Sequence, residues 1–336
     1  MKTRIIVPVL GIAALATAIS AAAQVVVRGT ESSDKTAARS EVTINTGDRD
    51  VVPLIKESKE TKVDATTTRT EAVTRARLND GSYFDWERST TVTKQLSPNS
   101  TVSSTDVVAK DRQGQDRVSS RIDETVNKSS SGEMDQTKMY TRNSSGQLVL
   151  DRVVDATTVN GSGGAATTVR VEKTPDVNGN LALQKQVDEV TVDHGAGGKV
   201  TTSTTRTANH LNGQLAVTAE ETTSITTQGG TKQIDSVEKT PGATGWEVSA
   251  RSTTTETMAP DGSVNRETIE QGRASYSPKT DGATTAPIVP QRKVVEHEVR
   301  KPDGTMVLQR DVFHRDVNGD WQPESFSTKE ADKALP

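Results

Sequence analysis

The sequence predicts an all-β protein, an elongated antiparallel β-meander built of imperfect tandem β-hairpin repeats of about 33 residues. Threonine and valine, which favour strands, are abundant throughout. Glycine-rich turn signals recur at intervals of roughly sixteen or seventeen residues, and their Asn-Gly, Asp-Gly and Gly-Gly pairs supply the positive φ angles that tight hairpin turns require. The runs between turns alternate threonine, valine, serine and charge, so each run fits one long strand.

Apolar material is scarce in this chain. Hydrophobic residues make up 31% of it and aromatic residues 3%, less than in a typical globular domain. A single hairpin of this composition is marginal alone, so neighbouring repeats must pair edge to edge. We therefore expect thin or shared cores, in an open twisted sheet, a partly single-layer sheet or a sandwich.

Residues 1–23 have the pattern of a signal peptide. Lys2 and Arg4 give a positive start, an apolar run follows, and the alanines at 21–23 match a small-residue cleavage site. Cleavage is expected after Ala23, and the mature protein is expected to be periplasmic, on the cell surface or extracellular. No later stretch is apolar enough to cross a membrane as a helix, and the alanine-rich signal is typical of a bacterium.

Residues 24–60 contain two short apolar runs separated by polar residues, and are expected to form an N-terminal cap or linker. The β-hairpin repeat region is predicted over 61–276. Its segments SSGQLVL, VNGNLAL and LNGQLAV share a plan: glycine, a polar residue, leucine, and a second apolar residue two positions later. Each segment reaches another glycine-rich turn about fifteen residues on, so one repeat is one hairpin.

The segment 211–240 predicts its own register. If Gly229 and Gly230 occupy the two central turn positions, Ile225 lies opposite Ile234 and Glu220 opposite Lys239, which are favourable cross-strand pairs. The same register sets Glu221 against Glu238, an unfavourable pair. Strict alternation then divides the apolar residues from the threonines. It places on one face Leu215, Val217, Ala219, Ile225 and Ile234, and on the other Thr218, Glu220, Thr222, Ser224 and Thr226.

The C-terminal part differs from the repeats. Residues 277–291 contain three prolines and are expected to form a linker. Residues 292–326 are predicted to form a C-terminal β-hairpin with larger side chains, and 327–336 a disordered tail.

The residues favour a protein that is not an enzyme. Cysteine is absent, which excludes disulfides and thiolate metal sites. No serine stands in a nucleophile elbow, and few aromatic or apolar residues are available to wall a dry pocket. We expect no cofactor, no catalytic residues and no metal site, with one weak candidate. Asp316, Asn318 and Asp320 alternate like the first ligands of a calcium loop, although Trp321 stands where that loop needs glycine.

Two groups of side chains are candidates for surface binding. Tyr83, Phe84 and Trp86 are close in sequence, and alternation puts Phe84 and Trp86 on one face and Tyr83 on the other. Such a group suits sugar stacking, or it closes the first hairpins as a local apolar patch. Thr222 and Thr226 belong to a threonine stripe that can bind a surface, or that simply reflects strand propensity.

Charge excludes one class of partner. The formal net charge is -4, with 41 basic and 45 acidic residues scattered along the chain, so no broad positive surface is available for nucleic acid. The partner stays unknown; a cell-envelope component, a glycan or another protein fits. The sequence thus favours an exported, non-enzymatic β-repeat protein with a structural or adhesive role at the bacterial cell envelope or outside the cell. The alternatives are a carbohydrate-binding or carbohydrate-active protein, and an ice or mineral surface binder.

Overall fold

The computed structural model describes residues 24–31, 37–45, 50–78, 80–110, 114–195, 198–209, 212–242, 245–273, 287–300, 306–316 and 318–323, with side chains from residue 55 onward. The predicted signal peptide at 1–23 and the predicted tail at 327–336 lie outside the described residues, as do residues 277–286 of the predicted linker.

The described chain is almost entirely β-strand, with one short 3-10 turn, η1, at Ser162–Gly164. The strands are β1 (Gln24–Glu31), β2 (Ala37–Asn45), β3 (Asp50–Lys62), β4 (Thr67–Arg77), β5 (Tyr83–Ser97), β6 (Ser100–Lys110), β7 (Asp116–Ser129), β8 (Gly132–Arg142), β9 (Leu148–Asn160), β10 (Ala166–Pro175), β11 (Leu181–Asp193), β12 (Lys199–Ala208), β13 (Leu215–Gln228), β14 (Thr231–Gly242), β15 (Gly245–Met258), β16 (Val264–Arg273), β17 (Ile288–Arg300), β18 (Met306–Arg315) and β19 (Trp321–Pro323).

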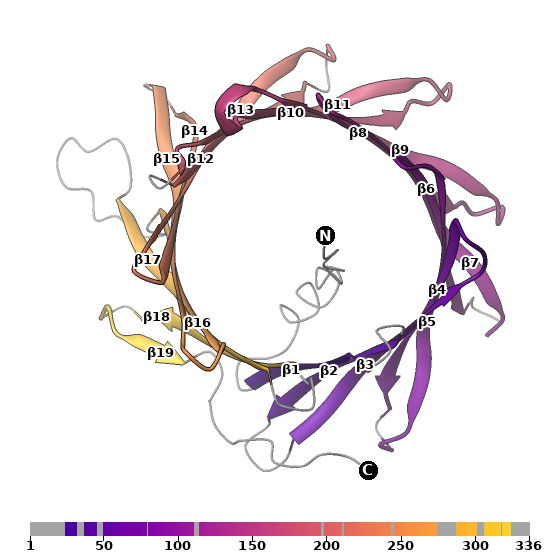
Figure 1. Ribbon diagram of the computed structural model, residues 1–336, viewed down its shortest axis with the longest axis horizontal. Coiled ribbons are helices and arrows are strands. Elements are labelled where there is room, and N and C mark those ends of the chain that lie inside the picture. Colours follow the sequence, from indigo (N-terminus) through magenta and orange to yellow (C-terminus); the bar gives the residue numbers. More distant parts are fainter. Residues whose placement is uncertain are drawn as a thin grey trace.

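The strands form one antiparallel meander, so the predicted fold class is confirmed. Each strand pairs with the next along the chain, within one sheet. β18 also pairs with β1, from Met306 opposite Gly29 to Arg310 opposite Val25. The meander therefore returns to its first strand, and Figure 1 shows the wall running round a ring.

Two boundaries differ from the prediction. Residues 24–60, expected to be a cap or linker, contain β1, β2 and most of β3, because their short apolar runs pair with one another along the sheet. The expected linker 277–291 ends inside β17, which begins at Ile288. The C-terminal hairpin is present as β17 and β18, with the short β19 added.

The predicted register of the 211–240 hairpin is confirmed. Ile225 lies opposite Ile234, Glu220 opposite Lys239, and Glu221 opposite Glu238. Gly229 and Gly230 have φ angles of 57° and 82°, which is the left-handed region that a two-residue hairpin turn needs.

β-bulges recur near one end of the sheet. In β5, β7, β9, β11, β13, β15 and β17, one extra residue interrupts the pairing with the preceding strand shortly after the turn. Consecutive bulges from β5 to β15 are 31 to 34 positions apart, so the bulge is the structural counterpart of the 33-residue repeat. The extra residues are Trp86, Ser119, Asp151, Gln184, Thr218, Ser249 and Gln291.

Three of these extra residues donate a hydroxyl hydrogen bond to the preceding strand. The hydroxyls of Ser119, Thr218 and Ser249 donate to the backbone carbonyls of Val107, Thr205 and Glu238, at 3.1, 3.4 and 3.3 Å. Each carbonyl belongs to the residue that the bulge faces. The hydroxyl thus satisfies an acceptor where the ladder is interrupted.

Each bulge moves the alternation of side chains by one residue. Thr205 lies opposite Ala219, but the next residue, Arg206, lies opposite Val217. Leu215 and Val217 therefore lie on the opposite face from Ala219 and Ile225, so the predicted five-residue apolar face is wrong. Strict alternation failed because Thr218 is an extra residue of β13 that has no partner on β12.

The wall is one sheet thick. The buried apolar residues of the described chain are Ile55, Ala76, Val153, Ala208 and Val294, and no described side chain is less than 2% exposed. The two faces still differ. On β11, Thr191 is 8% exposed, whereas its neighbours Val190 and Val192 are 45% and 37% exposed. Side chains converge on the concave face of a curved sheet and spread apart on the convex face, so Thr191 marks the concave face and Val190 the convex face.

Hydroxyl pairs cross between strands on the concave face. Thr191 and Thr201 hydroxyls are 2.9 Å apart, and the register continues this row through Thr223 to Ser236, whose hydroxyls are 3.2 Å apart. Equivalent pairs on the same face are Thr91 with Thr105, Thr158 with Thr168, and Thr254 with Thr268. These bonds satisfy the shielded polar side chains that take the place of an apolar core.

Candidate functional site

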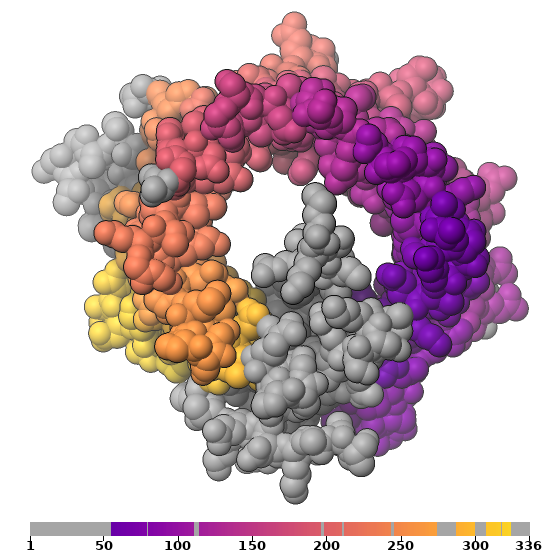
Figure 2. All heavy atoms as spheres, in the orientation of Figure 1, coloured from indigo at the N-terminus to yellow at the C-terminus, as the bar shows by residue number. Residues whose placement is uncertain are grey.

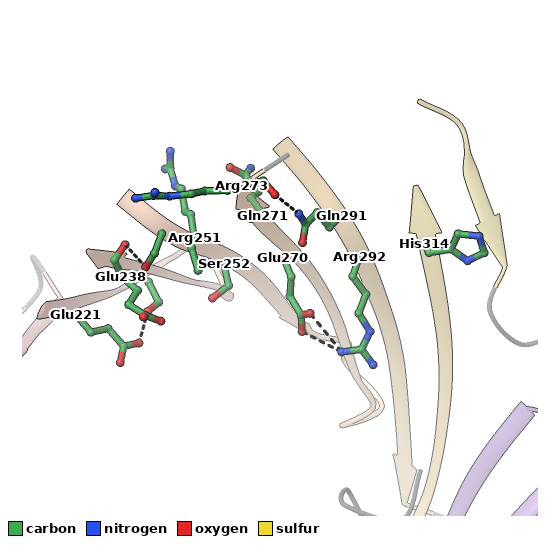
Figure 3. A pocket seen from close by; sticks show the side chains of 14 residues that line it. Glu221, Glu238, Arg251, Ser252, Glu270, Gln271, Arg273, Gln291, Arg292 and His314 are labelled. Atoms are coloured by element: carbon green, nitrogen blue, oxygen red, sulfur yellow. Dashed lines mark hydrogen bonds and ion pairs between the residues drawn. The ribbon is translucent and has the colours of Figure 1, made fainter. Parts of the chain in front are cut away.

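A polar hollow lies mainly on the concave face of β13 to β18, toward the bulged end. Its volume is about 770 Å³, and the surrounding ring is shown in Figure 2. Figure 3 shows its lining side chains. They are Glu221, Ser236, Glu238, Ser249, Ala250, Arg251, Ser252, Glu270, Gln271, Gly272, Arg273, Gln291, Arg292 and His314.

Glu221 and Glu238 stand directly opposite each other on β13 and β14 and both line the hollow. The pair that looked unfavourable in the sequence is therefore at the site. Ser236 contacts the Glu221 carboxylate through its hydroxyl, and Thr223 contacts the Ser236 hydroxyl at 3.2 Å. These bonds hold one carboxylate of the pair, and like charges this close are tolerated only where water reaches them.

The other wall of the hollow carries cations. Glu270 lies opposite Arg292, and Arg292 opposite His314, across β16, β17 and β18. Arg292 Nη1 is 3.2 Å from Glu270 Oε1, as the dashed lines in Figure 3 show. At the bulged end, Arg273 Nη2 is 2.9 Å from Glu247 Oε2, and its Nε donates to the Val248 carbonyl at 3.3 Å.

The hollow is polar and open to solvent. It carries both signs of charge and opens to solvent, whereas an enzyme site usually shields its reacting groups in a largely apolar pocket. Among the described residues, no group of three or more histidine, aspartate or glutamate side chains is arranged to hold a metal ion. No helix in the described part of the chain is long and apolar enough to cross a membrane.

The predicted aromatic group lies at the bulged end of β5. The rings of Phe84 and Trp86 are 6.2 Å apart at 39°, and their shared face matches the prediction. Phe84 is 36% and Trp86 57% exposed. Trp86 is itself the bulge residue, and Asp85 between them pairs with Arg75 and Arg88.

Those two guanidinium groups fix the strand behind the aromatic pair. Asp85 Oδ1 is 3.1 Å from Arg75 Nε, and Asp85 Oδ2 is 2.5 Å from Arg88 Nη2. The hydrogen bond from Arg88, and then that from Arg75, hold the pKa of Asp85 below its ordinary value despite partial desolvation. The aromatic rings are thereby presented on an ion-paired strand.

The threonine stripe lies on the convex face. Thr222 and Thr226 are both exposed, and Thr222 lies opposite Thr202 on β12 and Val237 on β14. Thr222 is next to Glu221 of the hollow but lies on the opposite face of the sheet, and neither threonine lies near the aromatic group, so the predicted binding residues belong to separate surfaces.

The Asp316 turn is built like two other turns of the chain. Asp316 Oδ1 accepts the backbone N–H groups of Asn318 and Asp320, each at 2.9 Å. These bonds, that from Asp320 first, lower the pKa of Asp316. Asn143 accepts the two equivalent N–H groups with an uncharged amide, so this turn geometry needs no ion. Calcium binding by Asp316, Asn318 and Asp320 stays a prediction.

Sequence reasoning missed the hollow because its two walls come from distant repeats. The one available signal was the Glu221–Glu238 pair, a local conflict of the kind that functional sites tolerate. Nothing in the sequence joins that pair to Arg292 and His314, because the registers of four successive strand pairings, from β14 to β18, connect them.

Comparison with known proteins places the chain in no family. No family model and no curated protein matches the sequence. Among solved structures, the chain is similar to a multiply substituted mutant of Rh. blastica porin, with a TM-score of 0.46 and 10% identity over 86% of this chain and 97% of that one. Similarity at this level transfers neither activity nor location.

Proposed function

We propose that this protein is an exported, non-enzymatic β-repeat protein with a structural or binding role at the bacterial cell envelope or outside the cell. The observation that carries the proposal is the wall itself: a sheet one layer thick, polar on its concave face, with few buried apolar residues. Such a wall offers two large water-exposed surfaces and little dry interior for catalysis.

The predicted signal peptide supports export, and the repeats support a surface role. Each hairpin repeat adds a similar area of exposed surface, so weak contacts between single hairpins and a partner can add up to firm binding. The ion pairs that cross between strands, such as Arg121 with Asp106 at 2.6 Å and Arg266 with Glu298 at 2.9 Å, place both signs of charge on the long strands. Charges so placed oppose uncontrolled edge-to-edge association.

A carbohydrate-binding role is the second candidate, and the Phe84–Trp86 pair favours it. Exposed aromatic rings on a rigid strand can stack on sugar rings. The ice or mineral alternative is weaker, because Thr222 and Thr226 lie on a convex wall rather than on a flat array.

Binding to washed bacterial envelopes and to a glycan array tests both candidates. The structural or adhesive role predicts retention of the full chain on envelopes. The carbohydrate role predicts glycan binding that falls at least about tenfold in the double variant Phe84→Ala, Trp86→Ala. A chain that binds neither material and remains a monodisperse monomer would contradict the proposal.

A further inference from the structure

The bulges gather one class of side chain at one rim of the ring. Side chains before each bulge alternate between the faces in the opposite phase from those after it. The leucine position of the repeat therefore lies on the convex face, where Leu181 and Leu183 join Val190 and Val192. In six of the seven bulged strands this rim position is large and apolar. This position stands three residues before the bulge residue, and its occupants are Tyr83, Leu148, Leu181, Leu215, Trp246 and Ile288, with Asp116 in β7.

This apolar rim is open to its surroundings. Leu181 is 45%, Trp246 43% and Tyr83 38% exposed. In the turns just beyond the same rim, Val177 is 101% and Leu78 46% exposed. Exposed apolar residues repeated at one height around a ring form a continuous feature, unlike single exposed residues scattered over a surface.

The repeats keep hydrophobicity at this position but not shape. Tyrosine, leucine, tryptophan and isoleucine alternate there, so no constant surface is offered to a protein partner, whose interface needs close complementarity. A fluid partner tolerates such variation. A rim also lies around one end of a ring, as Figure 1 shows, so a flat surface can touch it at many repeats at once.

Charges around the rim nearly balance. In the described part of the rim the cations are Arg77, Lys110, Arg142, Arg273 and Arg315, opposed by Asp116 in the same row and by Asp80, Asp176, Asp316 and Asp320 in the turns. Lys110 Nζ is 3.1 Å from Asp116 Oδ1, and Arg273 pairs with Glu247. Tryptophan, tyrosine and aliphatic side chains beside arginine and lysine are typical of groups that lie in the headgroup region of a bilayer, and the near balance of charge removes any need for anionic lipid.

We propose that the bulged rim is a lipid-binding surface, on which the ring stands in the headgroup interface of a bilayer without spanning it. The inference rests on the proposed role at the envelope and names the partner of one surface. The apolar rim residues enter the interface, and the walls of the ring remain in water.

Flotation of the full chain with lipid vesicles tests the proposal. Vesicles of phosphatidylcholine alone are compared with vesicles that also contain phosphatidylglycerol. The rim variant is Tyr83→Ser, Leu181→Ser, Trp246→Ser. The matched control is Met134→Ser, Val159→Ser, Val190→Ser, whose parent side chains are 61%, 53% and 45% exposed away from the rim.

We expect the full chain to float with both kinds of vesicle, with a bound fraction that changes by less than about threefold between them or on adding salt. The rim variant should bind at least about tenfold more weakly, and the control within about twofold of the unchanged chain. Circular dichroism of both variants should retain the β-sheet spectrum, which separates lost binding from lost folding.

Four results would overturn the proposal: no flotation of the unchanged chain, equal loss in the control, binding only to anionic vesicles, or a dimer that the rim variant dissociates. The last would assign the rim to a second copy of the chain. Retention on washed envelopes without flotation would leave the proposed function standing and remove the lipid surface. Failure of both envelope retention and flotation would contradict the proposed function as well as the lipid-binding surface.

Discussion

At one end of the ring the strands run in unbroken register up to their turns, except for a slip at Leu96 in β5, whereas at the other end a bulge interrupts β5 and every second strand from it to β17 a few residues after the turn. Gln228 pairs with Thr231 directly across Gly229 and Gly230 at the regular end. At the bulged end, the turn from β10 to β11 is held by Asp176, and the register then slips at Gln184. Leu181 and Leu183, at odd positions, thus lie on the same face of β11 as Val190 and Val192, at even positions.

The comparison teaches that the repeat encodes a change of face as well as a hairpin. Without the bulge, Leu181 and Leu183 would point to the concave face and Val190 to the convex face. With the bulge, Leu181 and Leu183 share the convex face with Val190 and Val192, whereas the concave face carries the hydroxyl rows and ion pairs together with some apolar residues such as Ile225 and Ile234. A wall of this kind is stabilised by cross-strand pairs rather than by a core.

The largest expected effect is at the regular end, at Gly198. A Cβ built there would lie 2.1 Å from the Ile225 carbonyl oxygen, and the φ angle is 97°. Gly198→Ala should lower the free energy of unfolding by about 3 kcal/mol, because backbone must move. At the bulged end, Gly179→Ala is the control: its φ is 83° but nothing lies within 4 Å, so about 1 to 2 kcal/mol of strain is expected. Urea unfolding measures both, and equal losses would contradict the difference between the ends.

The second prediction removes a bulge. Deletion of Thr218 removes the extra residue, so Val217 and Leu215 keep their partners Arg206 and Ala208 and stay on the convex face, but β13 loses the local bend and twist that the bulge supplies. We expect a loss of about 2 kcal/mol in the free energy of unfolding. Thr218→Val keeps the extra residue and loses the hydroxyl's exposed contacts with the Thr205 carbonyl and the Thr207 hydroxyl, at a cost of about 1 kcal/mol or less. A deletion that costs no more than Thr218→Val would show that the bend at the bulge does not stabilise the sheet.

Sequence reasoning reached the hairpin register but not the bulges, for a physical reason. The Gly229–Gly230 turn is signalled by the residues that form it, since few others adopt positive φ. A bulge tolerates tryptophan, serine, aspartate, glutamine and threonine alike, so residue type does not mark it. The available signal for a bulge was that the apolar residues of one strand change from odd positions, Leu181 and Leu183, to even positions, Val190 and Val192.

Longer-range features left no local signal. The pairing of β1 with β18 joins residues near the two ends of the chain, and it arises from the accumulated twist and curvature of many strands. For the candidate sites, alternation correctly grouped Phe84 with Trp86, because the spacing of two residues holds up to the bulge. It could not find the hollow, whose walls meet only through that curvature.

The third prediction compares the two faces at the regular end. Thr191 is 8% exposed and its hydroxyl is 2.9 Å from that of Thr201. Thr191→Val should lower the free energy of unfolding by about 1 kcal/mol, because the Thr201 hydroxyl loses a shielded partner. Thr222→Val, on the exposed convex face, should change it by less than about 0.5 kcal/mol. Chemical denaturation of the two variants distinguishes them, and a larger loss in the Thr222 variant would reverse the assignment of concave and convex faces.

The smallest effect concerns two aspartates on neighbouring strands that face opposite sides of the wall. On the concave side of β8, desolvation, followed by the charges of Glu124 and Glu133, raises the pKa of Asp135. On the convex side of β9, the hydrogen bond from Lys173 lowers the pKa of Asp155, with a further bond from Gln136. Ionised Asp155 therefore stabilises the fold above its unfolded pKa of about 3.9, and this stability is lost as the pH falls through its lower folded pKa. Asp135 has the opposite sign, because stability falls as the pH rises from the unfolded value through its raised folded pKa.

At pH 7, Asp155→Asn should thus destabilise and Asp135→Asn should stabilise the protein, each by no more than a few tenths of a kcal/mol because both carboxylates are partly solvated. Both differences from the unchanged chain should shrink toward zero as the carboxylates are protonated below about pH 3. Urea unfolding at pH 7 and at pH 3 measures the two signs. A shift of the same sign in both variants would mean that the concave and convex faces do not differ in how they solvate charge, and the division of the wall into two electrostatic environments would then be wrong.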